Sequence, residues 1–203
     1  HTRSGRVTGV QTCALPICSL DLLLAMPITR LELLLGKYLG LSAALACSTI
    51  AGFGLAGLVL SYGIGLAALG HYAVFILSTL MLGLAFLSLA MLISVQCSSK
   101  VAASGVAIAV WFFFVLVYDL VLMGALIVAG GGYFGRVFPF LLFLNPADIF
   151  RILNVYHLEE LRTLYGLAAV MPGTMAGSWL LGLALTAWIV MPLALAWKLF
   201  RDQ

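Results

Sequence analysis

Asp119 is the residue whose surroundings in the sequence most clearly call for a chemical role. It stands within residues 106–128, VAIAVWFFFVLVYDLVLMGALIV, where fifteen side chains are Val, Ile, Leu or Phe. A carboxylate in such a helix is costly in lipid, so it turns toward protein or water, where it ties helices together or lines a substrate path. Both roles stay open. No Lys or Arg partner is evident at a matching depth, and the possible hydrogen-bond partners are Ser78, Thr79 and Thr186.

Other reactive side chains form weaker patterns. Ser104 lies in Ala-Ala-Ser-Gly, which lacks the first Gly of the Gly-x-Ser-Gly motif of intramembrane serine proteases, and its candidate base, His157, lies in a different loop. His157 and Glu160 have an i,i+3 spacing that suits a metal, but a metal site needs two or three further ligands and none is evident. Cys47 and Cys97 give neither a disulfide framework nor a metal-ligand spacing. We therefore expect no catalytic residue, no metal site and no cofactor.

The composition places these residues in a membrane protein. Of 203 residues, 64% are hydrophobic and 8% charged, against about 25% charged in a typical soluble domain. Lys37 and Lys100 enclose 62 residues without a single Asp, Glu, Lys or Arg, and a soluble domain could not keep such a segment in solution. The net charge of +3 is scattered, so a nucleic-acid partner is not expected. The sequence predicts an all-α polytopic protein whose surroundings are the lipid bilayer.

Four apolar stretches are long enough to cross a bilayer. The residues of the Asp119 stretch favour insertion by about −5 to −9 kcal/mol in sum, which outweighs a cost of about 3 kcal/mol for the carboxylate. The predicted spans are approximately residues 38–60, 72–95, 106–128 and 175–199, with an outer loop over 129–174. Basic residues favour the cytoplasmic side, and the alternating spans place five there against three outside; the inner ones are Arg30, Lys37, Lys100, Lys198 and Arg201, and the outer ones Arg136, Arg151 and Arg162.

The segment before the first span predicts an amphipathic approach helix over residues 19–37. Thr29 followed by Glu32 has the spacing of a capping box, which starts a helix by pairing two free backbone N–H groups with side chains. Arg30 and Lys37 mark its cytoplasmic side. The segment is either an ordinary juxtamembrane helix or a docking surface for a cytosolic partner. Small residues in the span that follows favour close helix packing; they include Gly36 and Gly40 in a GxxxG spacing, and Gly52, Gly54 and Gly57 further on.

The outer segment predicts one or two short helices that lie in the membrane interface or dip into it. Asn145 suits an N-cap, Pro146 the first helical position, and Asp148 the positive helix N-terminus. Asp148 and Arg151 have the spacing of an i,i+3 ion pair, which we expect on the wetter side of an apolar stripe. Glu159 and Arg162 repeat that spacing.

The first 18 residues are expected to lie outside the fold. They show no helical periodicity and no apolar run, and residues 7–17, VTGVQTCALPI, resemble the in-frame translation of a sequencing adapter. On this interpretation residues 1–18 are non-native, Cys13 carries no information, and residues 19–203 form a partial transmembrane domain.

Three stretches carry a resemblance to a known family. LLLAMPITRLELLLGKYLG, from Leu22 to Gly40, resembles the element of ABC-2 type permeases that leads from a cytosolic coupling region into the third transmembrane helix. SSKVAASGVAIAVWFFFVLVYDLVL, from Ser98 to Leu122, and LLFLNPADIFRILN, from Leu141 to Asn154, are similar to the permeases of the nitrous oxide reductase maturation system. The likeness implies a six-helix permease, with the four spans as helices three to six.

The same resemblance implies partners and a role. The permease would form a homodimer in the bacterial inner membrane, bind a cytosolic ATP-binding cassette subunit, and meet a periplasmic accessory protein over its outer loop. ATP-driven motion would support assembly of the copper–sulfur centre of nitrous oxide reductase. The coupling contacts would be Arg30, Glu32, Lys37 and Lys100, and the periplasmic-side contacts Asn145, Pro146, Asp148 and Arg151.

Two other functions remain as alternatives. One is a general ABC-2 exporter of lipids or hydrophobic compounds, and the other is a passive membrane scaffold for accessory proteins. In each case the chain itself carries out no bond chemistry.

Overall fold

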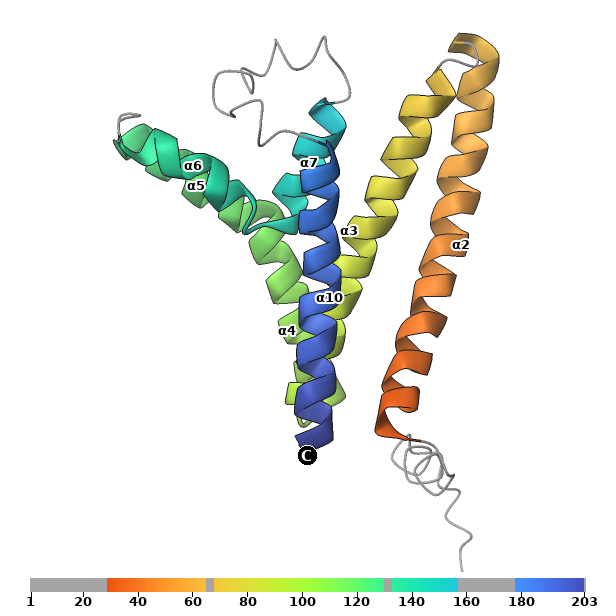
Figure 1. The fold of residues 1–203 in the computed structure, drawn as a ribbon, viewed down its shortest axis with the longest axis vertical. Coiled ribbons are helices and arrows are strands. Elements are labelled where there is room, and N and C mark those ends of the chain that lie inside the picture. The colour runs from red at the N-terminus through yellow and green to blue at the C-terminus, as the bar shows by residue number, and fades with distance from the viewer. Residues whose placement is uncertain (1–28, 65–67, 130–132, 157–177, 203) are drawn as a thin grey trace, which may run out of the picture.

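The computed structural model describes residues 29–64, 68–129, 133–156 and 178–202, and within them every regular element is a helix. The chain runs through α2 (Arg30–Ile64), α3 (Ala68–Gln96), α4 (Lys100–Phe112), the π-helical turn η1 (Phe113–Val117), α5 (Tyr118–Ala129), α6 (Tyr133–Leu142), α7 (Pro146–Tyr156) and α10 (Ser178–Asp202). Figure 1 shows these elements.

Four helical stretches are long and apolar enough to cross a bilayer, which confirms the predicted all-α polytopic fold. They are Leu31–Leu60, Tyr72–Gln96, Lys100–Val128 and Trp179–Arg201. The first begins earlier than predicted because α2 continues without a break from the approach segment into the span. The third also begins earlier than predicted, and Asp119 lies in its second half.

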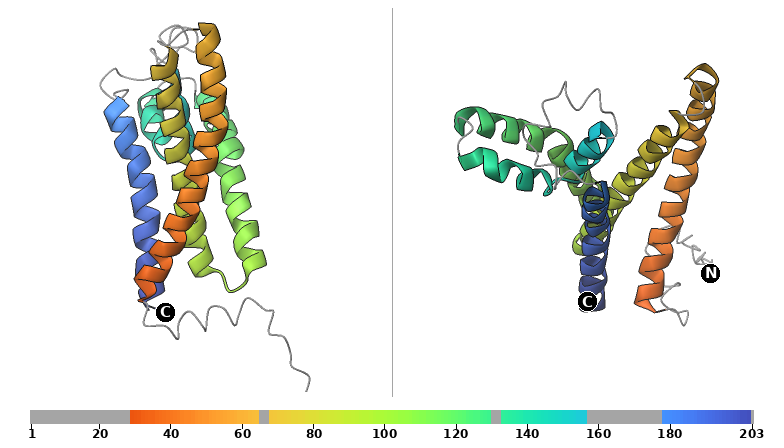
Figure 2. Two further views of the ribbon diagram at one scale, coloured as in Figure 1. Left: turned by 90° about the vertical axis from the view of Figure 1, so that its right-hand side faces the viewer. Right: turned by 45° about the horizontal axis from the view of Figure 1, so that its top comes forward.

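The helices alternate in direction, as the predicted layout requires. The start of α2, the turn between α3 and α4, and the end of α10 lie at one end of the bundle, and α7 lies toward the other (Figures 1 and 2). The basic residues Lys37, Lys100 and Lys198 therefore gather at the end that the charge bias assigns to the cytoplasm. We call this the inner end and the opposite one the outer end.

Local sequence explains where two of the helices begin. The Thr29 N–H donates to the Glu32 carboxylate at 2.8 Å, and the Glu32 N–H donates to the Thr29 hydroxyl oxygen at 3.2 Å. This reciprocal pair confirms the predicted capping box. Ser99 caps α4 in the same way, because its hydroxyl oxygen accepts the Ala102 N–H at 3.2 Å.

The third span is bent, whereas the sequence predicted one regular helix. Over η1 the backbone takes π-helical bonds, and the Tyr118 N–H bonds to the Phe113 carbonyl five residues back. An extra residue in one helical turn is a recognised cause of sharp bends. Beyond η1, α5 leans away from the bundle and lies against α6 (Figure 1).

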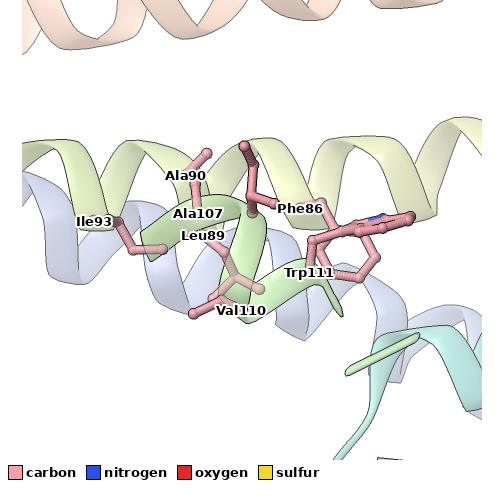
Figure 3. Close-up of a pocket in the computed structure, with 8 residues that line it drawn as sticks. Phe86, Leu89, Ala90, Ile93, Ala107, Val110 and Trp111 are labelled. Carbon is pink, nitrogen blue, oxygen red and sulfur yellow. The ribbon is translucent and has the colours of Figure 1, made fainter. Parts of the chain in front are cut away.

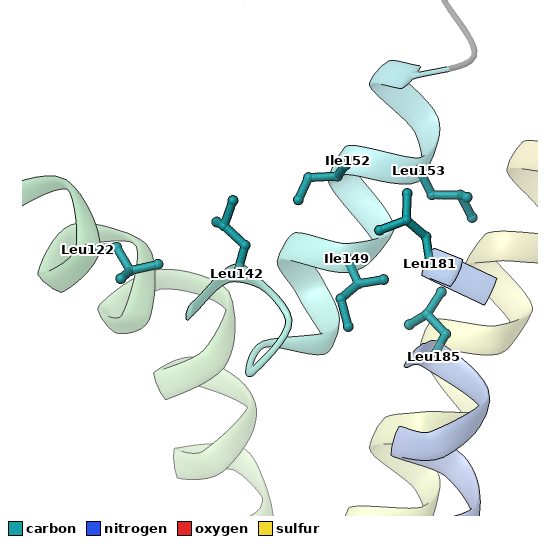
Figure 4. Packing of buried hydrophobic residues seen from close by; sticks show 7 residues of the cluster. All are labelled: Leu122, Leu142, Ile149, Ile152, Leu153, Leu181 and Leu185. Atoms are coloured by element: carbon teal, nitrogen blue, oxygen red, sulfur yellow. The ribbon is translucent and has the colours of Figure 1, made fainter. Parts of the chain in front are cut away.

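The short helices predicted for the outer segment are present as α6 and α7, and α7 is packed against the long helices. Ile149 is fully buried, Ile152 and Leu153 are nearly so, and α7 packs on both α3 and α10. Figure 4 shows Ile149 and Leu153 beside Leu185 and Leu181 of α10, and Ile152 on the side of α7 that faces Leu142. This outer cluster also includes Leu122 and Leu142. Apolar side chains of α7 therefore fill the space between the long helices.

A second apolar cluster holds the inner end. Leu34 and Tyr38 of α2 pack there with Met91 of α3 and Ala196 of α10. The Tyr38 hydroxyl donates to the Leu84 carbonyl at 3.3 Å and accepts from the Ser88 hydroxyl at 3.1 Å. The helices α3 and α10 therefore contribute to both the outer and the inner cluster.

Close helix approach occurs at Gly57, one of the small residues of the first span that were expected to allow it, and at Gly83 of α3. A Cβ atom on Gly36 or Gly40 would meet no atom within 4 Å, so the Gly36–Gly40 pair brings no described helix close. A Cβ on Gly57 would come within 2.5 Å of the Tyr72 ring, and one on Gly83 within 2.7 Å of Leu45. These two glycines set the spacing of α2 and α3.

Some predictions concern residues outside the described ranges. They are the non-native segment 1–18, the part of the approach helix before Thr29, His157 with Glu160, and the Glu159–Arg162 pair. The numbering of the spans as helices three to six stays a prediction.

Candidate functional site

Asp119 has a cationic partner, which the sequence did not reveal. The Arg151 guanidinium, on α7, donates to the Asp119 carboxylate. The expectation that no Arg lies within reach is therefore wrong, because docking of α7 brings Arg151 beside the third span. The three hydroxyl residues considered as partners bond elsewhere: Thr79 to the Phe75 carbonyl, Thr186 to the Gly182 carbonyl, and Ser78 to Asn154.

Arg151 makes two further contacts. Its Nη2 donates to the Val115 carbonyl at 3.0 Å, and its Nη1 lies 3.3 Å from an Asp148 carboxylate oxygen. The predicted Asp148–Arg151 pair is thus present. The pair was predicted on the wetter side of the helix, but only 5% of the Asp148 side chain is exposed. The exposed fractions of the Arg151 and Asp119 side chains are 43% and 36%. One guanidinium therefore serves two carboxylates and a backbone carbonyl, which its fixed fork of donors allows.

Asn145 is fully buried and uses both ends of its amide. Its Oδ1 accepts the Ala147 N–H at 3.0 Å, which confirms the predicted N-cap of α7, with Pro146 at the first helical position. Its Nδ2 donates to the Asp148 carboxylate at 2.9 Å and to the Phe114 carbonyl at 2.8 Å. Asn145 thus joins the start of α7 to the bend of the third span.

Asp148 lies at the centre of this arrangement. Burial raises the pKa of its carboxyl to about 6, and the hydrogen bond from Asn145 acts in the opposite direction. A buried carboxylate needs donors on its oxygen atoms, and here Asn145 and Arg151 supply them. We call Asn145, Asp148, Arg151 and Asp119 the polar joint.

Hydrogen bonds hold α7 and its neighbours on other sides as well. Asn154 Nδ2 donates to the Ser78 hydroxyl oxygen of α3 at 3.0 Å. Trp188 of α10 donates to the Phe143 carbonyl at 3.1 Å, and Tyr118 donates to the Leu141 carbonyl at 2.7 Å. These connections tie α7 and the turn before it to α3, α5 and α10.

Sequence reasoning missed three of these residues: Asn154, Tyr118 and Trp188. A polar atom on an apolar helix needs a partner where water is scarce, and that need is the signal that could have singled them out. The sequence could not name the partners, because they are backbone carbonyls or side chains on other helices. The two partners of each bond are far apart in the sequence, so sequence spacing does not identify the contact.

The predicted coupling residues gather at the inner end, well away from the polar joint. Glu32 forms the capping box, Lys37 is exposed on α2, and Lys100 is the exposed first residue of α4. Arg30 is the first helical residue of α2. The structure thus brings these residues to one end of the bundle, as expected. Asn145 and Arg151, by contrast, bond to η1, near the middle of the third span.

Apolar grooves flank α3 on both sides. The groove between α3 and α4 has a volume of about 230 Å³, and Figure 3 shows Phe86, Ile93 and Trp111 among its lining residues. The groove between α2 and α3 has a volume of about 490 Å³ and is apolar apart from Ser48. Such surfaces accept hydrocarbon and offer no group for chemistry on a polar molecule.

Comparisons with known proteins agree with this arrangement. The family model described as "ABC-2 family transporter protein" matches residues 18–203. The chain is 39% identical over 191 residues to a Pseudomonas aeruginosa protein named "Probable ABC transporter permease protein NosY", covering 91% of this chain and 68% of that protein. A Stutzerimonas stutzeri protein of the same name is 38% identical over 192 residues, with the same coverage. The chain therefore belongs to the ABC-2 family of transporter proteins, as a multi-pass permease subunit of the NosY-like kind.

Proposed function

We propose that this permease supports assembly of the copper–sulfur centre of nitrous oxide reductase, through transport driven by a separate ATP-binding cassette subunit. It would act as a homodimer in the bacterial inner membrane with a NosD-like accessory protein on the periplasmic side. The observation that carries the proposal is the 39% and 38% identity to two proteins named as NosY permeases. The polar contacts of Asn145, Arg151 and Asp119 join α7 to the third span, which suits a subunit whose work is mechanical.

The arrangement of the helices supports a route for that mechanical work. A cytosolic ATPase would press on the inner end, where Lys37 and Lys100 are exposed and the capping box fixes the start of α2. The helices α3 and α10 pack against each other and reach α7. A displacement at the inner end would therefore be carried to α7, because packed helices move as rigid bodies.

The outer residues divide into two groups under this proposal. Asn145, Pro146 and Asp148 are buried, so they would act by holding α7 in place. Arg151 has 43% of its side chain exposed, so it is the one among the four that a periplasmic partner could contact directly.

The test is complementation of a strain that lacks the permease gene. Expression of the wild-type permease should restore acid-labile sulfide and copper in purified nitrous oxide reductase, and should do so only with an ATPase subunit that hydrolyses ATP. The ATPase subunit should also co-purify with the permease from detergent. Reductase with a complete copper–sulfur centre in the strain without the permease would overturn the proposal. Full restoration with an inactive ATPase subunit would indicate a passive scaffold instead.

The apolar grooves favour a second candidate, a general ABC-2 exporter of lipids or hydrophobic compounds. Their lining of Phe86, Leu89 and Trp111 suits hydrocarbon and not a polar copper or sulfur species. This candidate predicts that the deletion strain retains a complete reductase and accumulates a lipid or hydrophobic compound in the inner leaflet. Lipid analysis of the two strains separates the candidates.

A further inference from the structure

We propose that the N-terminal part of α7 is a latch that keeps the third span bent at η1, so that the lean of the α5–α6 hairpin depends on α7 being docked. The latch consists of two donors, the Asn145 amide and the Arg151 guanidinium, that bond to backbone carbonyls of η1. The proposal concerns the permease alone and needs neither ATP nor a partner subunit.

The backbone of η1 provides the first reason. In a regular α-helix the Phe114 carbonyl would accept the Tyr118 N–H, but here that N–H bonds to Phe113. The Phe114 carbonyl accepts Asn145 Nδ2 at 2.8 Å, and the next carbonyl, that of Val115, accepts Arg151 Nη2 at 3.0 Å. A carbonyl without a donor is costly inside a membrane. Donors from α7 therefore lower the free energy of the bent form relative to the regular helix.

The weak packing of α5 provides the second reason. Leu120, Ile127 and Val128 have 72%, 77% and 89% of their surface exposed. Leu122 is the buried exception, and it faces Leu142, at the end of α6 (Figure 4). Since α5 packs mainly on η1 and α6, its angle to the bundle is set at η1 and not by contact with the long helices.

The ion pair adds to the latch from the other side of the bend. Arg151 holds the Val115 carbonyl, before the end of η1, and the Asp119 carboxylate, which follows it on α5. One side chain therefore bridges the two halves of the bent span. Withdrawal of α7 would remove both bonds together with the Asn145 bond, and the span would be free to straighten or swing.

Distance measurements between two spin labels test this inference. The labels are placed on Val128→Cys at the far end of α5 and on Leu183→Cys of α10, where 89% and 57% of the native residues are exposed. The parent is the full permease with its native cysteines changed to Ser, reconstituted in lipid nanodiscs. We expect one defined distance in the parent and a shifted or broadened distribution in both Arg151→Gln and Asn145→Ala.

Two further variants decide what causes any shift. Thr186→Ala is the matched control, because the Thr186 hydroxyl bonds only to the Gly182 carbonyl of its own helix among the contacts described, and it should keep the parent distribution. Asp119→Asn removes the ion pair but leaves both carbonyl bonds, so its shift should be smaller than that of Arg151→Gln. An Asp119→Asn shift as large as that of Arg151→Gln would overturn the assignment of the latch to the carbonyl bonds.

Milder substitutions are available in case the first variants misfold. If Arg151→Gln or Asn145→Ala does not yield a monodisperse protein, Arg151→Lys and Asn145→Ser replace them. Lys has no planar fork with which to bond the Val115 carbonyl and Asp119 together, and Ser is too short to reach the Phe114 carbonyl. Distributions identical to the parent in these variants would refute the latch. Faster amide hydrogen exchange over residues 113–118 in them would support it.

Discussion

At the scale of single residues, the feature that organises this protein is the sharing of a few donors among many acceptors. Asn145 caps one helix, bonds a buried carboxylate and occupies a carbonyl of the bent span. Arg151 serves two carboxylates and another carbonyl of the same bend. Where water is scarce, each of these acceptors would otherwise be left without a partner, which is costly. The stability of the polar joint therefore depends strongly on the side chains of Asn145 and Arg151.

The Asn145 amide gives a prediction for stability. Asn145→Ala removes the N-cap, worth about 1 kcal/mol, and leaves the Phe114 carbonyl without its donor, which costs about 1 to 3 kcal/mol more. Asn145→Ser retains a capping oxygen and, like Asn145→Ala, loses the amide bonds to the Phe114 carbonyl and to Asp148. Denaturant unfolding in mild detergent should therefore rank the proteins wild type, Ser variant, Ala variant. Equal stability of the Ser and Ala variants would show that the cap contributes nothing.

The ion pair gives a second prediction, suited to a double-mutant cycle. If Asp119 ties α5 to α7, Asp119→Asn and Arg151→Gln should show a coupling free energy of about 0.6 kcal/mol and at most about 1.7 kcal/mol, as for polar pairs within membranes. The same cycle with Asp148→Asn in place of Asp119→Asn measures the coupling free energy between Arg151 and Asp148. Strict additivity of Asp119→Asn and Arg151→Gln would contradict the structural role and leave the substrate-path role of Asp119 as the remaining explanation.

At the scale of elements, the molecule is held together by a short helix among long ones. The buried face of α7 fills the outer space between α3 and α10, while α2 is held chiefly by α3. Gly57 and Gly83 allow that second contact, since a side chain at either position would strike the neighbouring helix. The distance between α2 and α3 is therefore short, and it depends on the absence of a side chain at these two positions.

Gly57 yields a prediction at this scale. A Cβ there would lie 2.5 Å from the Tyr72 ring, so Gly57→Ala should force the helices apart and lower stability by about 1 kcal/mol or more. Gly52→Ala is the matched control, because a Cβ at Gly52 meets nothing within 4 Å and Ala favours a helix by up to about 1 kcal/mol. Thermal unfolding compares the two. A Gly57→Ala protein as stable as Gly52→Ala would show that the contact between α2 and α3 adjusts at no cost.

At the scale of the whole molecule, exposed basic residues and the polar joint lie at different levels of the bundle. The basic residues lie at the inner end, and the joint lies beside η1, near the middle of the third span, with Asn145 and Asp148 buried. Among the described residues, α3 and α10 contribute side chains to both apolar clusters. Under the proposed function, a force applied at the inner end would reach the joint through these two helices and through α4, which runs from Lys100 to η1.

The layout predicts which positions a water-soluble thiol reagent reaches from each side of the membrane. In a cysteine-free background, Lys100→Cys and Arg201→Cys should react from the inner side of sealed vesicles. Gly70→Cys and Trp179→Cys, at the opposite ends of α3 and α10, should react from the outer side. Reaction of Lys100→Cys and Trp179→Cys from the same side would contradict the alternation of the spans.

The amino-acid sequence by itself determined the class of the protein, its four spans and their alternation. These follow from hydropathy, length and the placement of basic residues, which are local or additive properties. The sequence also determined the capping box at Thr29 and Glu32 and the cap at Asn145, because a cap involves residues only two or three positions apart.

Only the tertiary structure decided that Arg151 is the partner of Asp119, that α7 is buried between the long helices, and that the third span bends at η1. Each of these depends on groups that are far apart in sequence: Arg151 with Asp119, Asn145 with the Phe114 carbonyl, and Asn154 with Ser78. Hydropathy reports how much a segment avoids water but does not distinguish lipid from protein as its surroundings. That choice is made by packing, and packing also decides where a polar side chain finds its partner.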